Sequence, residues 1–94
     1  MKFHYYAETD SLYIDLLNNP GVQSQEAAPG IVLDFDVEGS LVGIDIDNAS
    51  RVVDLSELEV WDLPIKKFSV TGSSAEKELK LAEGTDIYRP KHGG

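Results

Sequence analysis

The segment from residue 30 to residue 50, GIVLDFDVEGSLVGIDIDNAS, constrains the fold most, because apolar and acidic side chains alternate on both sides of Glu38-Gly39. Successive side chains of a β-strand point to opposite faces of a sheet, so this alternation predicts two strands, 31–37 and 40–47. Each strand would have one apolar face and one polar face, as in a half-buried antiparallel hairpin.

A two-residue type I′ turn at Glu38-Gly39 would bring the apolar residues of the two strands together on one face. The predicted pairs on that face are Phe35 with Val42, Leu33 with Ile44, and Ile31 with Ile46. A shift by one residue would set apolar against acidic side chains, so the alternation fixes the register. A three-residue loop with a bulge is the alternative, and it pairs the two faces less well.

A second hairpin is predicted from strands 2–6 and 11–17, joined by the loop 7–10. Its predicted pairs are Lys2 with Asp15, Phe3 with Ile14, His4 with Tyr13, and Tyr5 with Leu12. Residues 22–27 are either a short edge strand or an irregular link, and Pro29-Gly30 ends them before the central hairpin.

These elements predict a mainly β (β-rich α+β) fold, an antiparallel β-meander of four to five strands with a short C-terminal helical or mixed segment. We expect residues 1–70 to form a single β-rich domain and residues 71–94 to be a partly disordered extension. The first-turn acids at Ser56-Glu57-Leu58-Glu59 predict a short helix there.

The predicted core consists of the apolar side chains on one face of both hairpins, namely Phe3, Tyr5, Leu12, Ile14, Leu16, Ile31, Leu33, Phe35, Val42, Ile44 and Ile46. A single sheet leaves such an apolar face exposed to solvent unless another segment or a second subunit packs against it. We expect Trp61, Leu63, Ile65 and Phe68 to provide that cover.

The formal net charge of −9 is concentrated in the predicted sheet. Residues 1–60 hold 12 acidic residues against Lys2 and Arg51, a net charge of −10, whereas residues 61–94 hold five acids against six bases, a net charge of +1. An anionic sheet repels the phosphate backbone of nucleic acids, so we expect no nucleic-acid binding. A basic protein partner or a cation is electrostatically favoured.

The composition excludes several other classes of function. The chain has no cysteine, which excludes disulfides, thiolate catalysis and cysteine-based metal sites. It has no apolar run of about 18 residues that would span a membrane, and its N-terminus, MKFHYYAETD, has no apolar signal region. We therefore expect a cytoplasmic protein without membrane contact and without a cofactor.

Four acids on the central hairpin are the candidate metal ligands: Asp34, Asp36, Glu38 and Asp45. With Gly39 they follow the spacing of an EF-hand calcium loop. That loop wraps around the ion between two helices, whereas the alternation here keeps the period of a strand. A solvated acidic sheet face is the favoured interpretation, and divalent-cation binding is the alternative.

His4, Tyr6 and Tyr13 form the one aromatic group with a candidate acid–base residue, and they would share the polar face of the first hairpin. No nucleophile motif, phosphate loop or dinucleotide fingerprint occurs in the chain, so no catalytic residues are predicted and we do not expect an enzyme. We interpret the three residues as an interaction surface. An open sheet edge at 2–6 or 22–27 also predicts a homodimer.

Two stretches, YYAETDSLYIDL and PGIVLDFDVEGSLVGIDIDNAS, resemble the small bacterial family called domain of unknown function 2283. The matching residues of the first stretch are Tyr6, Asp10, Leu12, Tyr13 and Ile14, although Ala7 replaces the expected Asp. Those of the second are Asp34, Asp36, Gly39, Leu41, Val42, Gly43 and Ile44. The resemblance covers residues 1 to 55, and the remainder with Trp61 is similar to an extended subgroup.

The resemblance implies a compact β-meander with a short helix and no established activity. It also implies gene neighbours that encode small toxin-like nucleases. Together these observations predict a protein-interaction module, in its specific form the neutralising partner of a small basic toxin-like protein. The alternative is a divalent-cation-binding protein or a metal-dependent enzyme built on Asp34, Asp36, Glu38 and Asp45.

Overall fold

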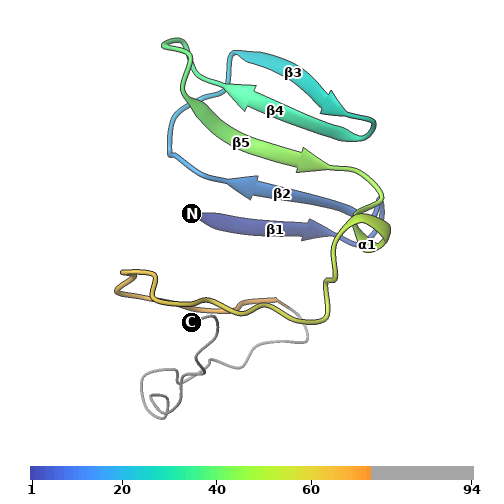
Figure 1. Cartoon of the computed structure of the whole chain (residues 1–94), viewed down its shortest axis with the longest axis vertical. Helices are drawn as coiled ribbons and strands as arrows, with labels where there is room; N and C mark the ends of the chain where they lie inside the picture. Colours follow the sequence, from blue (N-terminus) through green and yellow to red (C-terminus); the bar gives the residue numbers. More distant parts are fainter. Residues whose placement is uncertain (73–94) are drawn as a thin grey trace. The chain divides into compact units, whose positions relative to one another are not determined.

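The structure is a computed structural model that describes residues 1–72 in two units, Met1–Glu59 and the segment that begins at Val60. The first unit contains a five-stranded antiparallel sheet and one short helix (Figure 1). Its elements are β1 (Lys2–Tyr6), β2 (Ser11–Asp15), β3 (Gln23–Ala28), β4 (Ile31–Phe35), β5 (Leu41–Ile46) and α1 (Ala49–Val52). Among the described residues no helix is long and apolar enough to cross a membrane.

The strands lie in the order β1-β2-β5-β4-β3, so the predicted mainly β fold is confirmed (Figure 1). Each hairpin connects neighbouring strands, as in a meander. The β2–β3 connection departs from that rule, because it crosses from the middle of the sheet to the far edge. Consequently β5 pairs with both β2 and β4 and is the central strand.

The predicted registers of both hairpins are confirmed where the strands are regular. In the first hairpin Lys2 pairs with Asp15, and His4 pairs with Tyr13. In the second hairpin Ile31 pairs with Ile46, and Leu33 pairs with Ile44. The β2–β5 ladder, which the sequence did not predict, sets Leu12 opposite Ile46 and Ile14 opposite Ile44. Apolar residues therefore line up across the inner strands on one face.

The predicted two-residue type I′ turn is wrong. The loop is the three-residue alternative: the Asp36 amide donates to the Ser40 carbonyl (2.9 Å), and the Gly39 amide donates to the Asp36 carbonyl (3.0 Å). Only Gly39, at φ 88°, takes the left-handed conformation, so Glu38 avoids the strain that a type I′ turn would impose.

A bulge next to this loop absorbs the extra residue, because Phe35 pairs with Leu41 instead of Val42. The Val42 side chain is 2% exposed, and a methyl carbon of it lies beneath the backbone of Gly21 in the β2–β3 connection. The Val42 carbonyl accepts the Leu16 amide (2.8 Å). The bulge thus fastens the crossover connection to the sheet without disturbing the register beyond it.

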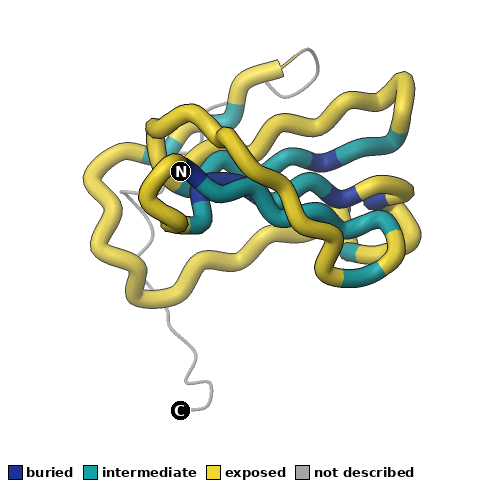
Figure 2. The backbone as a smooth tube through the Cα atoms, turned by 90° about the horizontal axis from the view of Figure 1, so that it is seen from above, coloured by how far each residue is buried: buried dark blue, intermediate teal, exposed yellow. Residues whose placement is uncertain are grey.

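The core is small and lies on the inner strands, where buried positions stand among many intermediate ones (Figure 2). Leu12, Ile46 and Ala49 are its buried centre, with Ile14 and Ile44 packed against them. The prediction of Phe3 and Tyr5 as core residues is wrong, since they are 50% and 47% exposed. Both belong to β1, and an edge strand has a neighbour on one side only.

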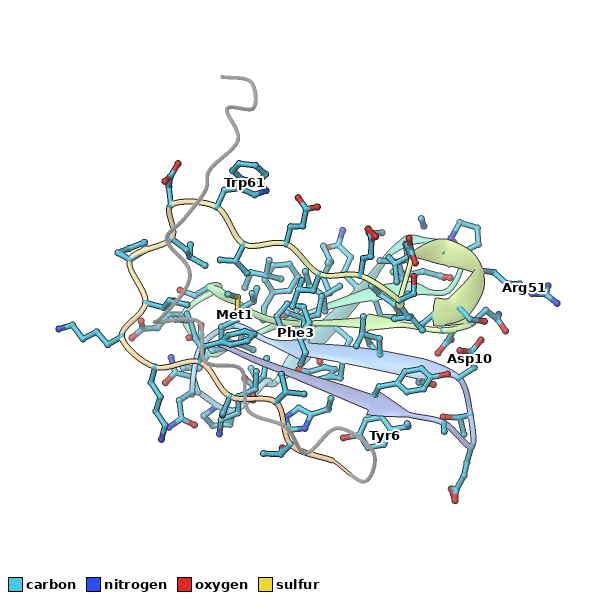
Figure 3. All side chains as sticks on the ribbon, turned by 90° about the horizontal axis from the view of Figure 1, so that it is seen from below. Met1, Phe3, Tyr6, Asp10, Arg51 and Trp61 are labelled. Atoms are coloured by element: carbon cyan, nitrogen blue, oxygen red, sulfur yellow. The ribbon has the colours of Figure 1, made fainter. Side chains whose placement is uncertain are left out.

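Asp10 connects the first hairpin to α1 (Figure 3). It adopts φ 56° at the end of the β1–β2 loop, and its carbonyl accepts the Ala49 amide (2.8 Å). Its carboxylate accepts the Ser50 hydroxyl (2.8 Å), the Ser50 amide (3.1 Å) and the Tyr5 hydroxyl (2.8 Å). These bonds satisfy amides at the start of the helix and hold Ala49, which is 0% exposed, against the sheet.

The helix predicted at residues 56–59 does not form. The Asp54 carboxylate accepts both the amide and the hydroxyl of Ser56, which stabilises a local turn instead. Residues 60–72 of the second unit contain no helix or strand. The expected cover by Trp61, Leu63, Ile65 and Phe68 and the boundary at residue 70 stay predictions. The expected disorder concerns 71–94, of which 73–94 lie outside the described residues.

The Asp10 carboxylate predicts an acid-sensitive stability. Its hydrogen bonds, first that from the Ser50 hydroxyl and then that from Tyr5, lower its pKa below the ordinary value of 3.8. The unfolded chain therefore binds more protons near that pH, and the stabilisation is present above pH 3.8 and lost as the pH falls through the folded-state pKa. Asp10→Ala should lower the melting temperature at pH 7, followed by circular dichroism, and the deficit should shrink towards pH 2.

Glu8→Ala, in the same loop, is the matched control and should have little effect. An equal decrease in melting temperature for the two variants would contradict the role of the Asp10 carboxylate. A decrease for Asp10→Ala that does not change with pH would contradict it as well.

Candidate functional site

The polar face of the sheet carries two rows of residues that run across all five strands. The registers give one row as His4, Tyr13, Asp45, Val32 and Glu26, and the other as Lys2, Asp15, Gly43, Asp34 and Ser24. The two rows contain four acids and one base. The structure therefore gathers on one face acids that come from four different strands.

Tyr13 and Asp34 form the centre of this face. The Tyr13 ring lies across Gly43, and a Cβ at that position would be 2.5 Å from the ring carbon that bears the hydroxyl. From there the hydroxyl donates to the Asp34 carboxylate at 3.0 Å. The other Asp34 oxygen accepts the Ser24 hydroxyl at 2.8 Å. This network links β2, β4 and β3 across the surface of β5.

Burial and the neighbouring carboxylates shift two pKa values on this face. Burial, followed by the hydrogen bond to Asp34, raises the pKa of Tyr13 to about 12. Burial, followed by repulsion from Asp47 and Asp34, raises the pKa of Asp45. Tyr13 is therefore neutral and a fixed hydrogen-bond donor at neutral pH.

His4 and Tyr6 occupy the edge of this face on β1. Their rings stack with centroids 6.5 Å apart and an interplanar angle of 18°. Tyr6 is 53% exposed and lies on the opposite side of β1 from Phe3 (Figure 3). His4 is the cross-strand partner of Tyr13. The three predicted interaction residues thus share one face, with His4 and Tyr6 accessible and Tyr13 held in the network.

Asp36 has a structural role that the sequence did not reveal. Its side chain is buried at 7% exposure, and its carboxylate accepts the amides of Glu38 (2.9 Å) and Ser40 (2.8 Å). It also accepts the side-chain amide of Asn19 (3.1 Å) from the β2–β3 connection. The Ser40 amide, the largest cause, lowers the pKa of this carboxyl. Asp36 therefore stabilises the loop and the crossover together.

The four candidate metal ligands do not form one cluster. Asp36 and Glu38 belong to the β4–β5 loop, whereas Asp34 and Asp45 lie on the polar face. Within residues 1–72 no group of three or more His, Asp or Glu residues is placed to hold one metal ion. A divalent-cation site on these acids stays a prediction, and Asp34 and Asp36 already accept hydrogen bonds from within the protein.

Sequence reasoning named Gly43 and Asp10 as residues of the family pattern but did not assign their roles, which are to organise the polar face and the start of α1. A signal for Gly43 was present, because a glycine in the middle of a strand often marks a site where another group approaches closely. Asp10 preceded the second strand of a hairpin, and Asp is one of the non-glycine residues that tolerate the left-handed conformation. Neither signal identifies its partner, since Tyr13 and Ser50 come from distant positions.

Fold and face together define a small five-stranded antiparallel sheet protein with one acidic, aromatic face. The model of the family described as protein of unknown function (DUF2283) matches residues 2–50, and the chain belongs to this family. No curated protein and no solved structure matches the chain significantly. The matched region begins with β1 and ends within α1, so it contains the whole sheet.

The contact between Tyr13 and Gly43 predicts a strong thermodynamic coupling. Gly43→Ala should destabilise the protein by about 1–3 kcal/mol, because the added Cβ overlaps the ring and overpacks the site. In a Tyr13→Ala background the same substitution should be neutral or slightly stabilising, since alanine is better than glycine in a strand. Urea unfolding of the wild type, both single variants and the double variant measures this coupling.

A coupling free energy near zero in this cycle would show that the ring does not lie over Gly43 in solution.

Proposed function

We propose that the protein is an interaction module whose acidic face binds a basic protein, and that its specific role is to neutralise a small basic toxin-like protein. The observation that carries this proposal is the placement of Asp15, Glu26, Asp34 and Asp45 on one face beside the exposed His4–Tyr6 pair. A face of this charge accelerates the encounter with a basic partner and disfavours acidic ones.

The aromatic pair would supply the anchoring contacts. Exposed tyrosines are frequent at the energetic centres of protein interfaces, because they bury a large area at a low cost in conformational entropy. Tyr6 is half exposed and already stacked on His4, so its side chain would lose little conformational entropy on binding. The Tyr13–Asp34–Ser24 network holds the Asp34 carboxylate in a fixed position on the same face.

The proposal predicts a salt-sensitive affinity that depends on where the acids lie. We would measure binding of a fluorescent arginine-rich peptide, used as the probe, by anisotropy at 50 and 300 mM salt. The double variant Asp15→Asn/Asp45→Asn should lose about tenfold or more in affinity at low salt, because it removes charge from the face itself. Tyr6→Ala should weaken binding at both salt concentrations, since an apolar contact is not screened.

The matched control is Glu8→Gln/Glu38→Gln, which changes the net charge by the same amount at two loop positions off the face. If the two double variants lose affinity equally, the probe senses only net charge and the proposed face is wrong. Calorimetric titration with Ca²⁺ and Mg²⁺ tests the alternative. A dissociation constant below about 100 µM that Asp34→Asn abolishes would support cation binding instead.

A further inference from the structure

Strand β1 is an open edge of the sheet. It pairs with β2 on one side, and among residues 1–72 no strand pairs with its other side. All five of its residues are exposed. The outer backbone amides and carbonyls of such an edge can pair with a strand from another chain.

The two edges of the sheet differ in how they resist such pairing. β3 contains a bulge between Glu26 and Ala28 and carries the Glu26 carboxylate, two features that discourage edge-to-edge association. β1 is regular along its whole pairing with β2 and contains neither a proline nor an acid. It presents Phe3, Tyr5 and Tyr6, which are 50%, 47% and 53% exposed. The protected edge is β3, and the unprotected edge is β1.

Charge also selects β1 as the place where two copies of this chain can meet. Each copy has a net charge of −9, so two copies repel each other. Every other strand carries one acid, namely Asp15, Glu26, Asp34 and Asp45, whereas β1 carries Lys2 and no acid. Contact along β3 would bring the Glu26 carboxylates of the two copies together, whereas β1 itself has no acid, so contact along β1 costs less repulsion.

We propose that a second copy of the chain adds its β1 antiparallel to β1, centred on His4, so that the two five-stranded sheets form one continuous sheet. Lys2 then faces Tyr6 of the second copy, Phe3 faces its Tyr5, and the two His4 residues face each other. This register pairs all five residues of β1 and is symmetric about a two-fold axis. It also continues the apolar face through aromatic cross-strand pairs, which are favourable in sheets.

A single cysteine tests this register, because the natural chain has none. Directly opposite residues of an antiparallel pair have Cβ atoms about 4.5–5.5 Å apart, close enough for a disulfide after a small adjustment. In a glutathione buffer the full chain with His4→Cys should convert to a covalent dimer. Gln25→Cys, on the exposed β3 edge, should stay monomeric under the same conditions. Equal cross-linking of both variants, or none at His4→Cys, would overturn the proposal.

A charge-swap test examines the same pairing without a covalent bond. In sedimentation velocity the wild-type chain should be a dimer at micromolar concentration. His4→Lys and His4→Glu should each be more monomeric, because like charges then face each other, and their mixture should recover the dimer. A wild-type monomer at every salt concentration, or a mixture that does not recover the dimer, would refute the β1 pairing.

Salt separates this inference from the proposed function. Raising the salt concentration from 50 to 300 mM should strengthen the homodimer, because it screens the repulsion between two anionic copies. The same change should weaken the binding of a basic partner. The dimer is measured with the purified chain alone, so either proposal can fail while the other holds.

Discussion

The structure depends on the pairing of β2 with β5. This ladder joins the two hairpins, aligns Leu12 and Ile14 with Ile46 and Ile44, and forms the core that residues 1–72 show. On the opposite face it places Gly43 beneath Tyr13, and the ring can lie there because glycine has no side chain. A core of this size offers little surplus stability. Hydrogen-bonded carboxylates add to this stability, because Asp10 joins α1 to the first hairpin and Asp36 joins the β2–β3 connection to the β4–β5 loop.

The local parts of this arrangement were predictable from the sequence. Alternation of apolar and acidic residues gave both hairpins and their registers, because a slip of one residue would expose every core side chain. The two-residue turn was favoured at Glu38-Gly39 and the three-residue loop kept only as the alternative, because a bulge that absorbs the extra residue and leaves the pairs beyond it in register is not visible in the alternation. The β2–β5 ladder was also missed, because nothing in a single sequence states which hairpins meet. The exposure of Phe3 and Tyr5 was missed for the same reason, because it depends on the order of the strands, which places β1 at the edge of the sheet.

The residues that connect this chain to its family prove to be largely structural. Asp10 anchors the helix, Tyr13, Asp34 and Gly43 form the network on the polar face, and Asp36 with Gly39 forms the β4–β5 loop. A pattern made of such residues specifies a sheet with an acidic surface. The functional proposal rests on the acids that β2, β3, β4 and β5 place on the polar face and on the exposed His4–Tyr6 pair of β1, and Asp34 and Tyr6 among them belong to the family pattern.

The central claim is that β2 and β5 pair with Tyr13 closed over Gly43, which divides the sheet into an apolar face and an acidic face. Proton NMR of the full chain tests it most directly. The account predicts nuclear Overhauser contacts between the Tyr13 ring and the Gly43 α-protons, and a strong upfield ring-current shift of those protons that disappears in Tyr13→Ala. Gly43 α-protons at ordinary chemical shifts, without contacts to the Tyr13 ring, would contradict the pairing and the division of faces built on it.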